Sequence, residues 1–482
     1  MRLSVLLGEN AYRLQGNAEI LEQEIDLVTA DPSRARPGSL LVCTQTALHN
    51  GYRSAEAAYT VGCRAFLTDR PLRLPPDAAQ LTVPNAEALL GRLVAGLLGE
   101  PARRMTVIGV SGTAGKTSVV HLLTALLEDQ GRRVASLTSD GVRFGTELRP
   151  AGRVVPNAAD LQCLLAELER SGAEVVILEL SAYMLAHKTA FSIPFAAVLL
   201  TNLSVAHVGH GEFASVADYH AAKRSLLALD APLAVIPAGI TDLPLCQGRT
   251  VTFGAGGDVY AEAVRPVADR AGLGSSLELC LPNGEKHCIS LPVPGDIAVG
   301  NALAAAALAT ALGVKGEIVA RVLSTCRPTG RMECLATCFG RYVFSDAAFE
   351  ADSLKRALDT LRPYTKGRLT VLVGSVGGRA VWRREALGRV ATEAADFAYF
   401  TADDPDGEDP VAICADMTAG ADPTRCCTIP DRRRAILRAV LEMRPDDVLL
   451  LAGKGGSTYQ LIGGQRLPFF EKEVVLEAIG QL

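Results

Sequence analysis

The first clear pattern along the chain is an alternation, beginning near residue 105, between short runs of β-branched apolar residues and longer stretches in which leucines recur every three or four positions. The short runs predict buried strands, and the longer stretches predict helices that bury one face. The expected strands are residues 105–110, 133–137, 175–180 and 196–201, and the expected helices are residues 117–130 and 158–171. This order is typical of a mainly parallel sheet with helices packed on it.

Two later regions differ from this first series. Residues 254–293 contain alternating segments and the turn signal Pro282-Asn283-Gly284, which predict a small antiparallel unit. A helix is expected at residues 299–312. After Pro328-Thr329-Gly330 a second strand–helix series begins, with strands expected at residues 341–344, 369–374, 397–401 and 448–452.

A chain of 482 residues is longer than one hydrophobic core usually serves, so we expect several domains. Hydrophobic residues make up 49% of the chain and aromatic residues 5%, which suits α/β packing. The prediction is an α/β protein of three domains: a smaller α/β domain at residues 1–103, a central P-loop-type domain with a mainly parallel sheet at residues 104–329, and a Rossmann-like α/β domain at residues 330–482.

Charge and composition narrow the functional classes. The net charge of −5 gives no basic footprint for nucleic acid. No apolar run is long enough for a membrane span and the first residues lack the features of a signal peptide, so we expect a cytoplasmic protein. We also expect a monomer. The twelve cysteines include no C-x-x-C pair, and we interpret them, Cys43 and Cys163 among them, as reduced core residues.

The segment from Gly109 to Thr117, Gly-Val-Ser-Gly-Thr-Ala-Gly-Lys-Thr, follows an expected strand and precedes an expected helix. Glycines there let the backbone approach phosphate oxygens, Lys116 would contact the β- and γ-phosphates of ATP, and the Thr117 hydroxyl would bind Mg²⁺. A strict P-loop spacing requires glycine where the chain has Val110. The alternative is a tight turn with a surface lysine, but the strand–helix context favours phosphate binding.

Gly112-Thr-Ala-Gly-Lys-Thr117 resembles the G-T-x-G-K-[ST] loop of the Mur ligases, and further landmarks of that family follow in the same order. They are Leu178-Glu-Leu-Ser181, Thr201-Asn-Leu-Ser204 with His207, Asp218-Tyr-His-Ala-Ala-Lys223, Gly330-Arg-Met-Glu333, Asp403-Asp-Pro-Asp-Gly-Glu-Asp-Pro410 and Ala452-Gly-Lys-Gly455 with Tyr459-Gln460. The chain is most similar to the MurE-type subgroup. This resemblance implies an ATP-dependent ligase that adds an amino acid to a UDP-N-acetylmuramoyl-peptide through an acyl phosphate, in peptidoglycan precursor synthesis.

The resemblance also implies roles for individual residues. ATP would be bound by Gly112, Thr113, Gly115, Lys116, Thr117, Ser118, Asn301, Arg331 and Asp346. The catalytic group would be Lys116, Glu179, His207 and Lys223. Mg²⁺ would be held by Thr117, Glu179, His207 and a carbamylated Lys223. The two substrates would be bound by Ser33, Arg34, Val155, Pro156, Ser181, Asp404, Asp406, Gly455 and Ser457.

Some of these roles also have a basis in the residues themselves. Glu179 at the end of one expected strand, and His207 just after another, would lie at the sheet edge where nucleotides bind. Each alone would more often be an ordinary surface or core residue. For Lys223, the alternative is a solvated lysine on a helix.

The sequence departs from the family pattern where substrates are recognised. The family's T-T-P is replaced by Val154-Val155-Pro156, its H-E by Gly456-Ser457, and the histidine of its D-Y-A-H by Phe349. The family's D-S-R aligns without gaps to Asp31-Pro32-Ser33, whereas a one-residue shift would offer Ser33-Arg34.

The most informative departure is Asp406, which replaces the arginine that pairs with the distal carboxylate of diaminopimelate in the enzymes that add it. A carboxylate there favours a cationic amino acid such as lysine or ornithine, unless Arg379 or Arg384 compensates. Alternatively, Asp406 only caps the next helix or points to solvent.

The altered pockets leave two other functions open. One is a divergent paralogue that joins a different carboxylate to a different amine. The other is a catalytically silent ATP-binding partner protein, which the presence of Lys116, Glu179, His207 and Lys223 makes the weaker alternative.

Overall fold

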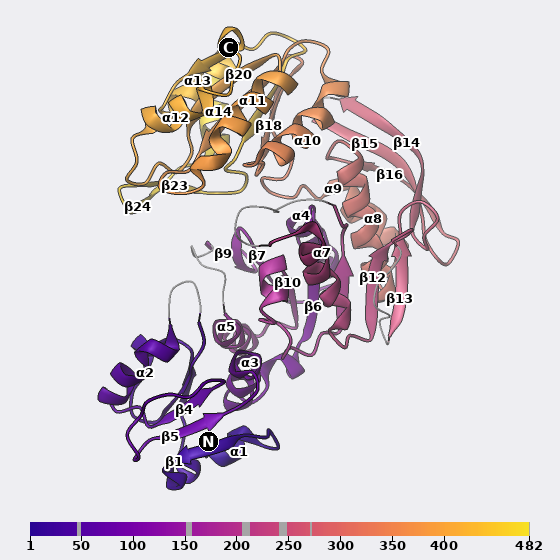
Figure 1. The fold of residues 1–482 in the computed structure, drawn as a ribbon. Helices are drawn as coiled ribbons and strands as arrows, with labels where there is room; N and C mark the ends of the chain where they lie inside the picture. The colour runs from indigo at the N-terminus through magenta and orange to yellow at the C-terminus, as the bar shows by residue number, and fades with distance from the viewer. Residues whose placement is uncertain (46–49, 151–156, 205–212, 241–247, 270–271, 482) are drawn as a thin grey trace. The chain divides into compact units, whose positions relative to one another are not determined.

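The computed structural model describes residues 1–481 apart from 46–49, 151–156, 205–212, 241–247 and 270–271. Figure 1 shows its helices and strands, coloured from the N-terminus to the C-terminus. Contacts between residues divide the chain into two compact units. The first contains Met1–Lys116 and Gly131–Val251, and the second contains Thr117–Gln130 and Thr252–Leu482. The three domain boundaries expected from the sequence stay a prediction.

The first part of the chain forms a five-stranded sheet in the order β1-β5-β4-β3-β2, in which only β1 runs antiparallel to its neighbour. Its strands are β1 (Arg13–Gly16), β2 (Leu27–Thr29), β3 (Ser39–Val42), β4 (Ala65–Thr68) and β5 (Ala79–Thr82). Its helices are α1 (Leu3–Leu7), α2 (Gly51–Thr60) and α3 (Ala86–Leu97). Apolar side chains of α1 and α3 share one core with the sheet, which makes this the small α/β region that the sequence predicts.

The central sheet has eight strands in the order β13-β12-β11-β6-β10-β7-β8-β9. They are β6 (Thr106–Ser111), β7 (Val134–Thr138), β8 (Gly141–Phe144), β9 (Glu147–Pro150), β10 (Val175–Glu179), β11 (Ala197–Leu200), β12 (Leu233–Pro237) and β13 (Arg249–Phe253). The strands from β12 to β7 are parallel, and β8 and β9 are antiparallel additions. The four strands expected here are confirmed within one or two residues.

Four helices accompany these strands, and two of them, α4 and α5, match the helices expected from the leucine spacing. They are α4 (Lys116–Asp129), α5 (Ala158–Arg170), α6 (Ala182–Ala186) and α7 (Val216–Arg224). Leu161, Leu165 and Leu168 on one face of α5 join the core of the sheet, so the leucine spacing identified the buried face. Cys163 on the same helix and Cys288 are exposed, so the interpretation of the cysteines as core residues was wrong for these two. Cys163 faces solvent between the buried leucines of α5. Cys43 is buried as expected.

The antiparallel unit expected at residues 254–293 is present as β14 (Tyr260–Asp269), β15 (Gly272–Cys280) and β16 (Lys286–Leu291). Gly284 adopts a positive φ of 83° in the turn between β15 and β16, which the Asn-Gly signal predicts. Two helices follow, α8 (Asp296–Ala311) and α9 (Gly316–Thr325).

The C-terminal sheet has six strands in the order β17-β18-β22-β19-β20-β21, parallel except for β17. They are β17 (Glu333–Cys338), β18 (Arg341–Asp346), β19 (Leu369–Ser375), β20 (Phe397–Ala402), β21 (Cys426–Thr428) and β22 (Val448–Ala452). Its helices are α10 (Ala351–Leu361), α11 (Arg384–Ala394), α12 (Pro410–Thr418), α13 (Arg432–Leu441) and α14 (Glu471–Ile479), and a hairpin of β23 (Tyr459–Ile462) and β24 (Gln465–Pro468) precedes α14.

Both faces of this sheet are covered. In β19, Val371 and Val373 pack with residues of α10, α11 and α12, whereas Leu372 packs with residues of α13 and α14. The alternation of side chains along a strand therefore supplies two cores, as in a doubly wound fold. The expected Rossmann-like architecture is confirmed. No helix among the described residues is long and apolar enough to cross a membrane.

Candidate active site

Residues 112–116 connect β6 to α4 and form the expected phosphate loop. Gly112 adopts a φ of 141° and Gly115 a φ of 80°, conformations that favour glycine. A Cβ at Gly112 would also overlap the hydroxyl of Thr201, which follows β11. The loop therefore lies directly against the end of the neighbouring strand, and glycine is required by both conformation and space.

Thr201 and Asn202 hold the loop at its middle residue. The Thr201 hydroxyl donates to the carbonyl of Ala114 at 2.6 Å. The Asn202 amide donates to the same carbonyl at 2.9 Å, and its Oδ1 accepts the Ala114 N–H at 3.0 Å. Since every polar group of Ala114 is bonded, the loop is fixed by side chains of β11's end.

Lys116 and Glu179 bring opposite charges to this edge of the sheet. The Lys116 ammonium lies 3.9 Å from the Glu179 carboxylate at the end of β10, and it donates to the Thr113 carbonyl at 3.2 Å. Glu179 also accepts the N–H of Ser139 at 3.2 Å. Both side chains are mostly shielded from solvent. A charged ligand that binds here would therefore displace little water from them.

Lys223 of α7 is buried beside this pair, with a side chain only 2% exposed. Its ammonium nitrogen lies 3.3 Å from the hydroxyl of Ser111, the last residue of β6. Burial, and to a smaller extent the nearby Lys116, lower the pKa of Lys223 to about 6, while Glu179 opposes them. The amine is therefore uncharged at neutral pH, and the alternative of a solvated helix lysine is wrong.

Other expected residues of the first unit have local structural partners. Ser181 caps α6 by accepting the N–H of Met184 at 3.1 Å. The Asp31 carboxylate accepts both the N–H and the hydroxyl of Ser33, and Arg34 lies 3.8 Å from Asp160. His207, Val155 and Pro156 lie outside the described residues, so their predicted roles stay predictions.

Three of the expected nucleotide residues of the second unit lie on helices. Thr117 and Ser118 are buried in the first turn of α4, and Asn301 is buried on α8.

At the end of β18, Asp346 accepts the N–H of Met332 at 2.7 Å. Burial raises the pKa of Asp346, while Arg331 and the Met332 N–H lower it. Arg331 thus faces the carboxylate expected near ribose.

A second charged cluster lies at the carboxyl edge of the C-terminal sheet. The buried Lys454 ammonium contacts Asp403 at 3.0 Å and Asp404 at 2.8 Å, and Asp404 also accepts the N–H of Leu461 at 3.0 Å. Gly455 adopts a φ of 52°.

The residues after Lys454 lie against the loop that leads into β17. A Cβ at Gly330 would overlap the backbone of Gly456. Ser457 uses its hydroxyl to donate to the Tyr459 carbonyl at 3.2 Å.

Asp406 forms hydrogen bonds with the β23–β24 hairpin. Its carboxylate accepts the N–H of Gly464 at 2.7 Å, and its own N–H donates to the Leu461 carbonyl at 2.9 Å. The cap of α12 is Asp409, which accepts the N–H of Val411. The structure thus favours a structural role for Asp406, in a turn rather than at a helix.

Arg384 is one of the two cations that could compensate for Asp406, but it forms ion pairs with other carboxylates. Its fully buried guanidinium pairs with Glu408 at 2.6 Å and with Asp416 at 2.9 Å. The same pairing, together with the N–H of Gly378, lowers the pKa of Glu408 to about 2. Arg384 therefore fixes the loop that carries Asp406 instead of facing a substrate.

Two groups of the site, Ser111 and Asn202, were not assigned from the sequence. Each follows or ends a strand at the edge where ligands bind, which is the signal that could have identified them. Their partners, Lys223 and Ala114, lie far away in the sequence.

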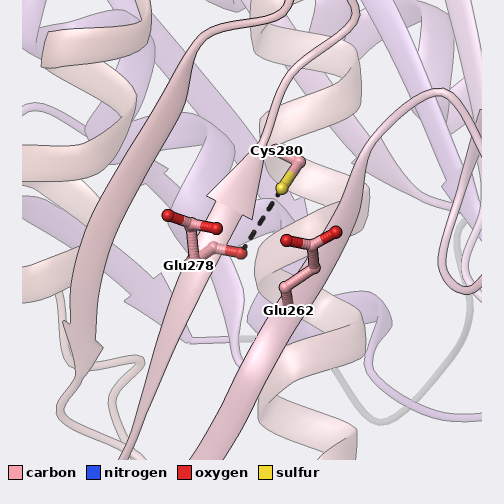
Figure 2. Close-up of side chains that lie close together, drawn as sticks. All are labelled: Glu262, Glu278 and Cys280. Carbon is pink, nitrogen blue, oxygen red and sulfur yellow. Dashed lines mark hydrogen bonds between the residues drawn. The ribbon is translucent and has the colours of Figure 1, made fainter.

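Among the described residues, one further cluster has a composition that suits a metal: Glu262, Glu278 and Cys280 on β14 and β15 (Figure 2). The Lys286 ammonium lies 2.8 Å from Glu262 and 3.0 Å from Glu278. The two carboxylates are thus already neutralised by a cation, and we assign no metal to them.

Comparison with known proteins shows the family of the chain. Residues 110–309 match the Mur ligase middle domain, and residues 330–455 match the Mur ligase, glutamate ligase domain. The chain is 32% identical to the UDP-N-acetylmuramoyl-L-alanyl-D-glutamate--2,6-diaminopimelate ligase of Caldanaerobacter subterraneus subsp. tengcongensis, over 100% of this chain and 99% of the relative.

Solved structures share the fold. A UDP-N-acetylmuramoyl-L-alanyl-D-glutamate--2,6-diaminopimelate ligase aligns with a TM-score of 0.71 at 24% identity, over 100% of this chain and 99% of that one. The MurF ligase of Thermotoga maritima in complex with ADP aligns with a TM-score of 0.59 at 17% identity, over 94% and 97%. The chain belongs to the Mur ligase family and is an ATP-dependent ligase.

Proposed function

We propose that this ligase adds an amino acid to UDP-N-acetylmuramoyl-L-alanyl-D-glutamate in peptidoglycan precursor synthesis. The observation that carries the proposal is the arrangement of Lys116, Glu179 and the buried, uncharged Lys223 around the phosphate loop. The full-length relative named for this reaction supports the choice of acceptor. The product would be an amide bond, formed with ATP as the energy source.

The chemistry follows from where charge develops. A carboxylate of the acceptor attacks the γ-phosphorus of ATP, and ADP leaves as the acyl phosphate forms. The amine of the incoming amino acid then attacks the acyl carbon and displaces inorganic phosphate. Lys116 would offset negative charge on the transferring phosphoryl group, and the glycines of the loop let its backbone approach the phosphate oxygens.

The donor set of the first unit fits Mg²⁺. Glu179 offers a carboxylate at the sheet edge, and oxygen ligands suit this ion. We assign Glu179, His207 and Lys223 to one Mg²⁺ and the Thr117 hydroxyl to another, as in other P-loop proteins. When bound, Mg²⁺ would neutralise phosphate charge in the transition state.

Lys223 fits this role only after a chemical change, because an amine does not bind Mg²⁺ well. Its uncharged amine can attack CO₂, forming a carbamate and releasing one proton. The carbamate is an anion with two oxygen donors. Burial next to Ser111 supports this proposal, since an uncharged amine is the reactive form.

For the other ligands, we propose that Asn301, Arg331 and Asp346 bind the nucleoside of ATP and that Ser33, Arg34, Ser181, Val155 and Pro156 contribute to the acceptor site. Asp404, Gly455 and Ser457 would face the amino acid. The domain ranges 1–103, 104–329 and 330–482 would then correspond to acceptor, ATP and amino-acid binding.

A substrate panel tests the proposal. Phosphate release from ATP is measured with UDP-N-acetylmuramoyl-L-alanyl-D-glutamate, the corresponding compounds one residue shorter and one residue longer, and folate monoglutamate, each combined with single amino acids. We expect release only with UDP-N-acetylmuramoyl-L-alanyl-D-glutamate. Release with another acceptor and none with this one would make the chain a paralogue of different specificity, and no release with any would make it a silent ATP-binding protein.

A further inference from the structure

Ser111, the last residue of β6, holds the amine of Lys223 in one orientation. Its side chain is fully buried, and its hydroxyl donates to the Leu180 carbonyl at 2.7 Å. A serine hydroxyl carries a single proton, and this bond uses it. Toward the Lys223 nitrogen, 3.3 Å away, the Ser111 oxygen can therefore only accept a hydrogen bond. One N–H of the lysine is thus directed at Ser111.

The backbone of the sheet fixes the position of this acceptor. β6 lies between β10 and β11 in the central sheet. The Ser111 carbonyl accepts the N–H of Thr201 at 2.8 Å, and the Leu180 N–H donates to the Val110 carbonyl at 2.8 Å. The hydroxyl of Ser111 and the carbonyl that receives its proton thus belong to hydrogen-bonded segments on adjacent strands. The Ser111 oxygen cannot move to follow a displaced amine.

Tyr219, one turn before Lys223 on α7, places the lysine against the same end of β6. The Lys223 nitrogen lies 5.6 Å from the centroid of the Tyr219 ring. Tyr219 is buried, and its hydroxyl donates to the Thr113 hydroxyl at 3.3 Å. Residues four positions apart lie on one face of a helix. This face of α7 therefore contacts two hydroxyl groups, at positions 111 and 113, on either side of Gly112.

We propose that Ser111 is a positioning residue for the carbamate of Lys223. This inference rests on the proposed function, in which that carbamate is a ligand of Mg²⁺. The carbamate forms when the nitrogen lone pair makes a bond to the carbon of CO₂, an electron pair of one C=O bond moves to its oxygen, and the nitrogen releases one proton to water. The nitrogen starts with two N–H groups and keeps one of them.

The hydrogen bond to Ser111 determines which N–H is kept. The N–H that Ser111 accepts stays in place, while the lone pair and the second N–H point away from β6. The new carboxylate group is then directed away from the strand. A buried N–H without an acceptor is costly, so Ser111 also stabilises the carbamate after it has formed.

The test measures the carbamate directly. Carbon-13 NMR is recorded on the full chain with ¹³C-labelled bicarbonate and Mg²⁺, without ATP or acceptor, and Lys223→Ala identifies the signal of this lysine. Ser111→Ala should raise the bicarbonate concentration that gives half of the maximal signal by about tenfold, the effect of a hydrogen bond lost from a buried N–H. Phosphate release in the complete reaction should fall at low bicarbonate and recover at high bicarbonate, a recovery that a general structural defect would not show.

Three further variants separate the hydroxyl from its surroundings. Ser111→Thr keeps the hydroxyl and should stay within about threefold of the wild-type bicarbonate dependence. Ser111→Cys replaces the oxygen with a weak acceptor of similar size, so it should show the same shift as Ser111→Ala without opening a cavity. Ser136→Ala removes another buried hydroxyl, on β7 of the same sheet, and should leave the bicarbonate dependence unchanged.

Two results would overturn the inference. One is a carbamate signal in Ser111→Ala and Ser111→Cys that saturates at the wild-type bicarbonate concentration. The other is the absence of any Lys223-dependent signal from the wild type. Both are read without acceptor or ATP, so they are independent of the substrate panel. A failure of the proposed function appears in that panel alone, as absent phosphate release with UDP-N-acetylmuramoyl-L-alanyl-D-glutamate.

Discussion

The carboxyl edges of the central and C-terminal sheets hold charged groups in different ways. At the central edge, Lys116, Glu179 and Lys223 occupy the positions that the family pattern assigns, and side chains of the next strand hold the loop between them. At the C-terminal edge, the pattern residue at position 406 has the opposite charge, and its carboxylate accepts a hydrogen bond from the β23–β24 hairpin.

This difference reflects what each edge must bind. Phosphate transfer depends on backbone N–H groups and charges placed around one phosphorus, which leaves few alternative positions. An amino-acid carboxylate needs only one guanidinium within reach, and that group can come from more than one position around the site. We therefore expect motif comparison at single positions to predict ligand contacts better at the first edge than at the second.

The largest expected effect comes from removing the charge at the phosphate loop. Lys116→Ala should lower ATP turnover by several hundredfold or more, a loss on the order found for such electrostatic groups, because the transferring phosphoryl group loses its cation. The fold should remain, since the side chain fills no core cavity. Steady-state phosphate release and circular dichroism measure the two outcomes. Lys355→Ala on α10 is the control, and near wild-type turnover in Lys116→Ala would remove the loop from the mechanism.

Lys223 should give the next largest effect. Lys223→Ala should be nearly inactive, because a carbamate ligand of Mg²⁺ would be lost, and millimolar formate or acetate with Mg²⁺ should restore part of the activity by occupying the vacated space. The same salts should leave the wild type unchanged. Full activity of the alanine variant would show that the buried amine has no part in catalysis.

The ion pair between Arg384 and Glu408 should make the stability of the fold depend on pH. Arg384 lowers the pKa of Glu408 to about 2 from its ordinary value of 4.5. A carboxylate whose folded pKa is lowered stabilises the fold fully above the unfolded pKa, and this contribution is lost as the pH falls from about 5 towards 2. Glu408→Gln should therefore melt below the wild type at pH 6, and the difference should shrink by pH 3. Melting temperatures between pH 3 and 7 measure this, and a constant difference would contradict the ion-pair account.

Much of the fold could be predicted from the sequence because strands and helices of this class bury regular patterns. The strands at β6, β10, β19 and β22 are almost entirely apolar, since helices cover both faces of their sheets. The hairpin of β8 and β9 was not predicted, because β9 is exposed along its whole length and has no apolar pattern.

The candidate site was only partly predictable for a different reason. The positions of Lys116 and Glu179 follow from strand ends, which the sequence shows. The burial of Lys223 does not, because α7 is largely polar and the Ser111 hydroxyl that its amine contacts lies 112 residues earlier in the chain. Likewise, the sequence does not distinguish Arg379, Arg383 and Arg384. In the structure, Arg384 is the one that pairs with Glu408 and Asp416.

The smallest expected effect is at Asp406, and it tests the comparison between the two edges most directly. If the carboxylate only holds the β23–β24 hairpin, Asp406→Ala should cost about 1 kcal/mol of stability or less, the scale of one partly exposed hydrogen bond. The ratio of kcat/KM for 2,6-diaminopimelate to that for lysine should change by less than about threefold, well below a lost carboxylate contact. Asp406→Asn retains an acceptor for the Gly464 N–H and should be closer still to the wild type. Competition between equal concentrations of the two amino acids measures the ratio. A large shift towards 2,6-diaminopimelate in both variants would show that the negative charge at position 406 does face the substrate, and that the two edges are less different than their hydrogen bonds indicate.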